Sequence, residues 1–135
     1  ALAPQQVAAM RLWLRHVFFG EPLPDVRPPV VTSGKDSLGF QAIIGQPKGV
    51  EVVELCHAFY REKPWPGPAS GERMPHKNAQ WKTTPLAKRN GQYTVTLETK
   101  GEDLERLHYY IRARVRLGQV TGWLSCPVQQ FMEKP

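Results

Sequence analysis

Alternating apolar and polar residues between Gln80 and Phe131 constrain the fold of this chain more than any other feature. The Asn90-Gly91 pair favours a two-residue hairpin turn. Alternating strands follow at Tyr93 to Leu97 and at Tyr109 to Val115. In each strand the alternation places apolar side chains on one face and polar side chains on the other. Such a series of short strands predicts antiparallel sheets with one buried face each.

The middle of the chain continues this pattern. Leu38 to Ile44 and Val50 to Tyr60 alternate in the same way, and Val120 to Phe131 forms a closing strand with Pro127 inside it. We therefore predict that residues 30–135 form one mainly β domain, an antiparallel β-sandwich of the immunoglobulin or fibronectin type III kind. In the second of these strands the core-facing residues are expected to be Val53, Leu55, His57 and Phe59.

The N-terminal segment has a different pattern. Pro4 to Phe19 has the apolar spacing of an α-helix, Gly20 ends it, and Glu21 to Pro29 forms a proline-rich extended linker. Residues 1–29 are therefore assigned to one N-terminal helix and its linker. The apolar surface of this helix is broader than packing on one side requires, which predicts contact with a partner. The residues expected in that contact are Trp13, Leu14, Val17 and Phe18.

Cysteine and histidine usage predicts no metal site and no cofactor. Cys56 and Cys126 lack metal-ligand spacing, and the four histidines are scattered. Cys126 lies one strand beyond the position that the usual immunoglobulin disulfide occupies, so we expect two free thiols. No stretch is long and apolar enough to span a membrane. Motifs of nucleophilic or phosphate-transfer catalysis are also missing. Cys56 and His57 do not form a catalytic pair, because adjacent strand residues point to opposite faces.

The strongest electrostatic feature is an arginine stripe, defined as Arg112, Arg114 and Arg116. Spacing by two places these side chains, together with Tyr110, on one face of a strand. The stripe predicts either an anion site or a solvated face on which the arginines pair with carboxylates such as Glu54. The formal net charge of +6 is compatible with both. Nucleic acid is not the expected partner, because Tyr110 is the one aromatic residue predicted on this face.

Arg61 to Ala79 is a long loop whose prolines and glycines exclude regular structure. Trp65 within it could stack on a sugar or cover the end of the sandwich. Trp81 and Trp123 are expected in the core or between the sheets.

The order of the elements resembles the carboxy-terminal region of bacterial α/β-hydrolase-type proteins of the PhoPQ-activated pathogenicity-related family. The matching segments are Trp13 to Val17, Val53 to Leu55, Phe59 to Arg61, Trp81 to Leu86, Asn90 to Val95, Tyr110 to Val115 and Leu124 to Val128. The resemblance implies a last hydrolase helix, a proline-rich linker and a fibronectin-like sandwich in a secreted or periplasmic protein. It implies no catalytic residue here, and residues 61–79 depart from it as an insertion.

These observations predict a noncatalytic accessory domain that packs on the catalytic domain of a larger hydrolase-like protein or shapes access to it. Self-association through the helix is the alternative partner. A second hypothesis is a free-standing module that binds carbohydrate or an anionic polymer through the loop at 61–79 and the arginine stripe.

Overall fold

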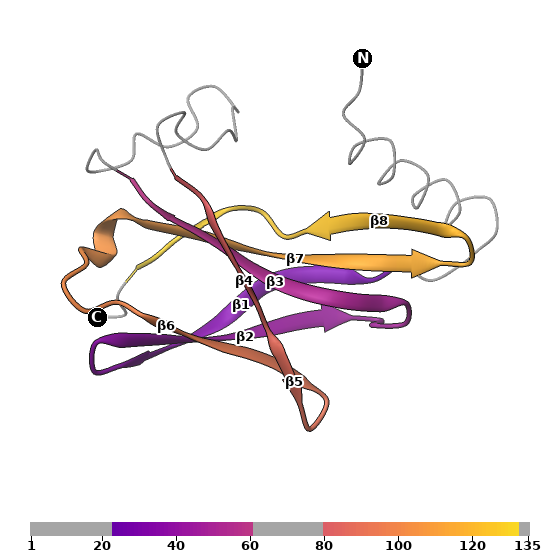
Figure 1. Ribbon diagram of the computed structural model, residues 1–135, viewed down its shortest axis with the longest axis horizontal. Coiled ribbons are helices and arrows are strands. Elements are labelled where there is room, and N and C mark those ends of the chain that lie inside the picture. The colour runs from indigo at the N-terminus through magenta and orange to yellow at the C-terminus, as the bar shows by residue number, and fades with distance from the viewer. Residues whose placement is uncertain (1–22, 61–79, 133–135) are drawn as a thin grey trace, which may run out of the picture.

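The structure is a computed structural model that describes residues 23–60 and 80–132. These residues form two antiparallel sheets packed face to face (Figure 1). The strands are β1 (Asp25–Gly34), β2 (Ser37–Gly45), β3 (Val50–Phe59), β4 (Lys82–Pro85), β5 (Ala87–Arg89), β6 (Gln92–Glu98), β7 (Leu107–Leu117), β8 (Val120–Ser125) and β9 (Gln129–Gln130). The predicted mainly β sandwich is confirmed at this level. The predicted N-terminal helix and the loop at 61–79 lie outside the described residues.

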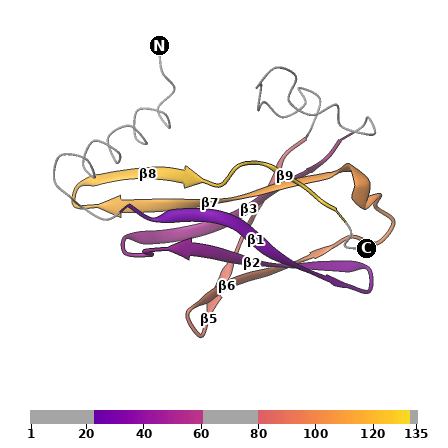
Figure 2. The ribbon, with the colours of Figure 1, turned by 180° about the vertical axis from the view of Figure 1, so that it is seen from behind.

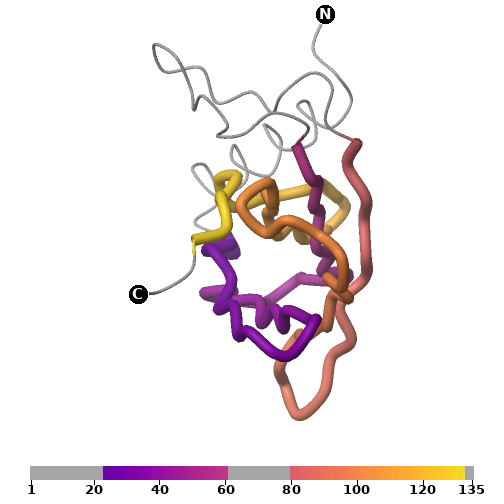
Figure 3. Tube along the Cα trace, turned by 90° about the vertical axis from the view of Figure 1, so that its left-hand side faces the viewer, coloured from indigo at the N-terminus to yellow at the C-terminus, as the bar shows by residue number. Residues whose placement is uncertain are grey.

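The four-stranded sheet has the order β1-β2-β6-β5, and the five-stranded sheet has the order β4-β3-β7-β8 with β9 also paired to β7. The chain passes from one sheet to the other between β4 and β5, and β5 then pairs with β6 (Figure 2). Viewed from the end, the two layers enclose the interior (Figure 3). A short 3-10 helix, η2 (Leu104–Arg106), leads into β7.

The core lies between the sheets, as the alternation predicts. Leu55 and Ile111, a register pair of β3 and β7, are both 0% exposed. Phe40 of the other sheet meets Tyr109 edge to face, with 5.2 Å between ring centroids. The inward residues of β6 that the sequence predicts, Tyr93, Val95 and Leu97, all pack against this core.

The hairpin predicted at Asn90-Gly91 joins β5 to β6. Both residues have positive φ, 52° and 77°, which is the geometry of a type I′ turn and matches the twist of the flanking strands. Near the C-terminus, the expected closing strand is divided into β8 and β9. Pro127 lies between them, in keeping with its missing backbone N–H.

Strand β1 begins at Asp25, inside the segment assigned to the proline-rich linker, so the sandwich includes residues before position 30. Its pairing with β2 shifts register between Arg27 and Val30. The two prolines of β1, Pro28 and Pro29, occupy that irregularity. Proline is tolerated there because an edge strand with a bulge needs fewer ladder hydrogen bonds. The predicted extended conformation is correct, but a continuous strand was not anticipated.

Candidate functional site: the outer face of the five-stranded sheet

The outer face of the five-stranded sheet brings together the predicted site residues of β7. Register pairing places Ala58 beside His108, Cys56 beside Tyr110, and Glu54 beside Arg112. From one end of β7 to the other, this face divides into two halves. We call them the apolar half, which consists of Cys56, Ala58, Tyr60, Trp81 and His108, and the charged half, which consists of Glu51, Glu54, Arg112, Arg114, Arg116 and Trp123. Tyr110 lies between the halves.

Three members of the apolar half, Tyr60, Trp81 and His108, form an aromatic cluster. The rings of Tyr60 and His108 stack with 3.9 Å between centroids, and Trp81 lies edge-on to Tyr60 at 6.2 Å. Trp81 also contacts Tyr110 with 5.3 Å between ring centroids. His108 is 0% exposed and Ala58 1% exposed, although both are on the sheet face that points away from the sandwich core.

Burial changes the titration of this cluster. Desolvation lowers the pKa of His108, although the hydrogen bond between Nδ1 and the Arg106 carbonyl opposes the effect. Burial is the main cause that raises the pKa of Tyr110 to about 12, and a hydrogen bond with the Cys56 thiol is the second. The Tyr110 hydroxyl therefore stays protonated further into the alkaline range than an ordinary tyrosine.

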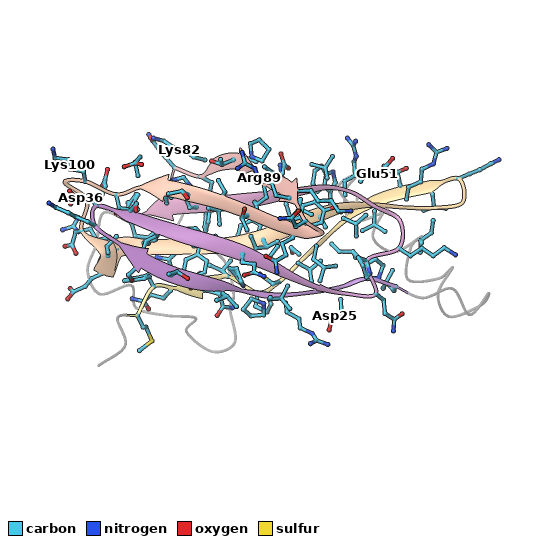
Figure 4. The ribbon with its side chains drawn as sticks, turned by 90° about the horizontal axis from the view of Figure 1, so that it is seen from below. Asp25, Asp36, Glu51, Lys82, Arg89 and Lys100 are labelled. Carbon is cyan, nitrogen blue, oxygen red and sulfur yellow. The ribbon has the colours of Figure 1, made fainter. Side chains whose placement is uncertain are left out.

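In the charged half, two of the three predicted arginines are paired with carboxylates from β3. Arg112 donates from Nε and Nη2 to Oε1 of Glu54, both at 2.9 Å. Arg114 Nε lies 3.5 Å from Oε1 of Glu51. Arg116 is exposed and donates from Nε to the Gly118 carbonyl at 3.2 Å. Figure 4 shows Glu51 toward one end of the sandwich, away from the end marked by Asp36 and Lys100.

A groove of about 370 Å³ lies beside this pairing. Its lining residues are Tyr110, Arg112, Trp123, Leu124 and Ser125. The Arg112 guanidinium carbon lies 4.5 Å from the centroid of the Trp123 ring, within the range of a cation–π contact. The groove therefore combines an aromatic surface, a planar donor group and hydroxyl groups.

The prediction that Trp81 and Trp123 belong to the core or to the space between the sheets is wrong. Both are partly exposed on the outer face. Trp123 pairs in register with Arg114, and so its side chain must leave the same face as the arginine stripe. That pairing was the signal in the sequence, but the strand register had to be known to use it. Trp65 lies outside the described residues.

Within the described residues, Cys56 and His57 do not meet as a nucleophile and a base. Cys56 belongs to the outer face, whereas His57, paired with Tyr109, faces the interior. Both cysteines are free and buried, which confirms the prediction of free thiols. Within residues 23–60 and 80–132, no group of three or more His, Cys, Asp or Glu side chains is arranged to hold a metal ion.

Among the described residues, no helix has the length and apolar character that crossing a bilayer would require. Comparison of the chain with protein-family models, with curated proteins and with solved structures found no match.

Proposed function

We propose that this chain is a noncatalytic accessory β-sandwich domain of the immunoglobulin or fibronectin type III kind, and that it docks on another domain through the outer face of its five-stranded sheet. The strand order supports the fold assignment. The order β1-β2-β6-β5 against β4-β3-β7-β8 corresponds to strands A-B-E-D against C′-C-F-G of immunoglobulin-like domains.

The observation that carries the docking role is the burial of apolar side chains on both faces of the β3–β7 pair. Leu55 and Ile111 are buried on the inner face, while Cys56 and Ala58 are buried on the outer face at 2% and 1% exposure. An antiparallel sheet with one solvated face alternates apolar and polar residues instead. Most of this outer face is already buried within the chain, and its partly exposed member Trp81 is where another domain can make contact.

The partner we propose is the catalytic domain of a larger bacterial, extracytoplasmic hydrolase-like protein, the class that the sequence resemblance implies. The contact would centre on Trp81, the partly exposed aromatic side chain of the apolar half, which is of the type enriched at interface cores. Trp13, Leu14, Val17 and Phe18, which the sequence predicts in contact with a partner, lie outside the described residues.

The test is calorimetric binding of the isolated chain to the catalytic domain of its parent protein, supplied as a separate polypeptide. We expect binding that Trp81→Ser weakens at least about tenfold, because aromatic anchors dominate such interfaces. Gln41→Ala, on the outer face of the other sheet, is the control and should change nothing. Absence of binding at about 100 μM, a concentration that detects even weak complexes, would reject the docking role.

A further inference from the structure

We propose that the groove beside Tyr110, Arg112 and Trp123 binds a neutral saccharide, with Trp123 stacking on the sugar ring and Arg112 donating to sugar hydroxyls. This inference goes beyond the docking role and does not depend on it. The groove lies on the charged half of the outer face, whereas docking uses the apolar half.

The chemistry of the lining matches a sugar. A pyranose ring has apolar C–H groups on its faces and hydroxyl groups around its edge. The groove offers the partly exposed Trp123 ring, beside the Arg112 guanidinium that lies over it, for the faces, and for the edge it offers Arg112 and Ser125. Arg112 Nη1 forms no hydrogen bond with a residue in the described part of the chain, so its N–H groups are available. A volume of about 370 Å³ is at the small end of ligand sites and suits a short saccharide segment.

The charge of the site favours a neutral ligand over an anionic one. Glu54 already occupies one edge of the Arg112 guanidinium through two contacts at 2.9 Å. The pair has no net charge, and an acidic ligand placed at Arg112 would also meet the field of the Glu54 carboxylate. Arg114 also lies beside a carboxylate, with 3.5 Å between its Nε and Oε1 of Glu51. The stripe that predicts an anion site from sequence is thus largely neutralised where the groove lies.

Contacts with two residues hold the Arg112 guanidinium in place. The Arg112 guanidinium lies over the Trp123 ring, with 4.5 Å from its carbon to the ring centroid. Glu54 fixes the same guanidinium from β3, the neighbouring strand. Both groups of the groove are therefore held in place before a ligand arrives, which reduces the entropy lost on binding.

In the experiment, the complete chain is titrated with neutral β-linked gluco-, xylo- and mannohexaose. Tryptophan fluorescence and calorimetry measure the binding. Oligogalacturonate and a heparin hexasaccharide serve as anionic probes. We expect at least one neutral hexasaccharide to bind with Kd below about 1 mM, and more tightly than either anion. Failure of all three neutral probes, or tighter binding of an anion, would overturn the proposal.

Variants locate the binding. Trp123→Ala should weaken it at least about tenfold, and Trp123→Phe, which retains an aromatic ring if the alanine variant does not fold, by a few-fold. Arg112→Lys keeps the charge but loses the planar fork, and should weaken binding about fivefold. Thr121→Ala, on the same strand and face but outside the groove, is the matched control.

Glu54→Gln separates the two kinds of ligand. It removes the carboxylate that neutralises Arg112, so a neutral saccharide should keep its affinity within about threefold while any anion should bind more tightly. Saccharide affinity that is unchanged in both Trp123→Phe and Arg112→Lys would show that the sugar binds elsewhere, and would overturn the assignment of the groove.

Discussion

Arg112 donates from both Nε and Nη2 to a single oxygen of Glu54, Oε1, at 2.9 Å. The two residues face each other across β3 and β7, the central strands of the five-stranded sheet. The Glu54 side chain is 18% exposed and that of Arg112 is 35% exposed, so the pair is only partly screened by water. It fixes the guanidinium that also contacts Trp123, and so it connects the stability of the sheet to the geometry of the groove.

A double-mutant cycle should measure this coupling. We expect Arg112→Gln and Glu54→Gln to interact by about 1 kcal/mol in the free energy of unfolding, at the upper end for partly exposed pairs. Urea unfolding of both single variants and the double variant gives the value. The coupling should shrink in 1 M salt because screening weakens partly exposed pairs. Additive single effects would contradict the pairing.

The face of β7 on which Arg112 lies could be predicted from the sequence, because strict alternation fixes which residues of a strand share a face. Tyr110 and the three arginines were placed together correctly for that reason. Partner strands were harder to identify. Trp123 joins the arginines only through the β7–β8 register, and an aromatic residue in a short strand is equally compatible with a core position.

Strand β1 shows a second limit of sequence patterns. Two adjacent prolines normally argue against a strand, but here the register shift between Arg27 and Val30 accommodates them. Pairing with β2 on both sides of this shift maintains the strand. Such tertiary pairing is not encoded in the local sequence, and so local rules predicted a linker where the sandwich has its edge.

Truncation of the core should be costly. Leu55 is 0% exposed, and Leu55→Ala should lower the free energy of unfolding by about 2–5 kcal/mol because it leaves a cavity among packed side chains. Val30 is 52% exposed, and Val30→Ala should change the free energy by less than about 0.5 kcal/mol. Urea denaturation compares the two. Equal losses would mean that the core is not where the structure places it.

Gly49 should tolerate a side chain less well than Gly91. Both have positive φ, 86° and 77°, but a Cβ at Gly49 would collide with the carbonyl oxygen of Arg116, whereas at Gly91 it would meet open space. Gly91→Ala should cost about 1 kcal/mol for its strained φ. Gly49→Ala should cost at least about 1 kcal/mol more, because it adds overpacking to the strain.

The Gly49 variant also affects the site, since the Arg116 N–H donates to the Gly49 carbonyl at 2.8 Å. Thermal melts of the two alanine variants provide the comparison. Similar melting temperatures for both would show that the β2–β3 turn and β7 are not in contact as described.

Thiol titration should find two reactive groups after denaturation without reductant. Cys56 lies on the outer face, with Sγ 3.8 Å from Thr83 Oγ1, whereas Cys126 Sγ accepts a hydrogen bond from the Ile111 N–H at 3.2 Å. In the native state both should react slowly, because they are 2% and 4% exposed and burial raises the pKa of the Cys126 thiol. A count of zero in denaturant would reveal a disulfide and contradict this arrangement.

The stability of the fold should fall as pH decreases below about 6.5, the usual pKa of histidine. Burial lowers the pKa of both His57 and His108, and in His57 the nearby Lys82 lowers it further. The unfolded chain therefore binds protons in a pH range where the folded chain stays neutral, so protonation favours unfolding. Between pH 7.5 and 5.5 we expect a loss of up to about 1.4 kcal/mol per histidine in the free energy of unfolding, measured by urea titration above the range where carboxylates titrate. His108→Gln should make this dependence shallower, and Gln41→Ala should leave it unchanged. Stability that stays constant or rises toward pH 5.5 would mean that these two imidazoles are not buried in their neutral form.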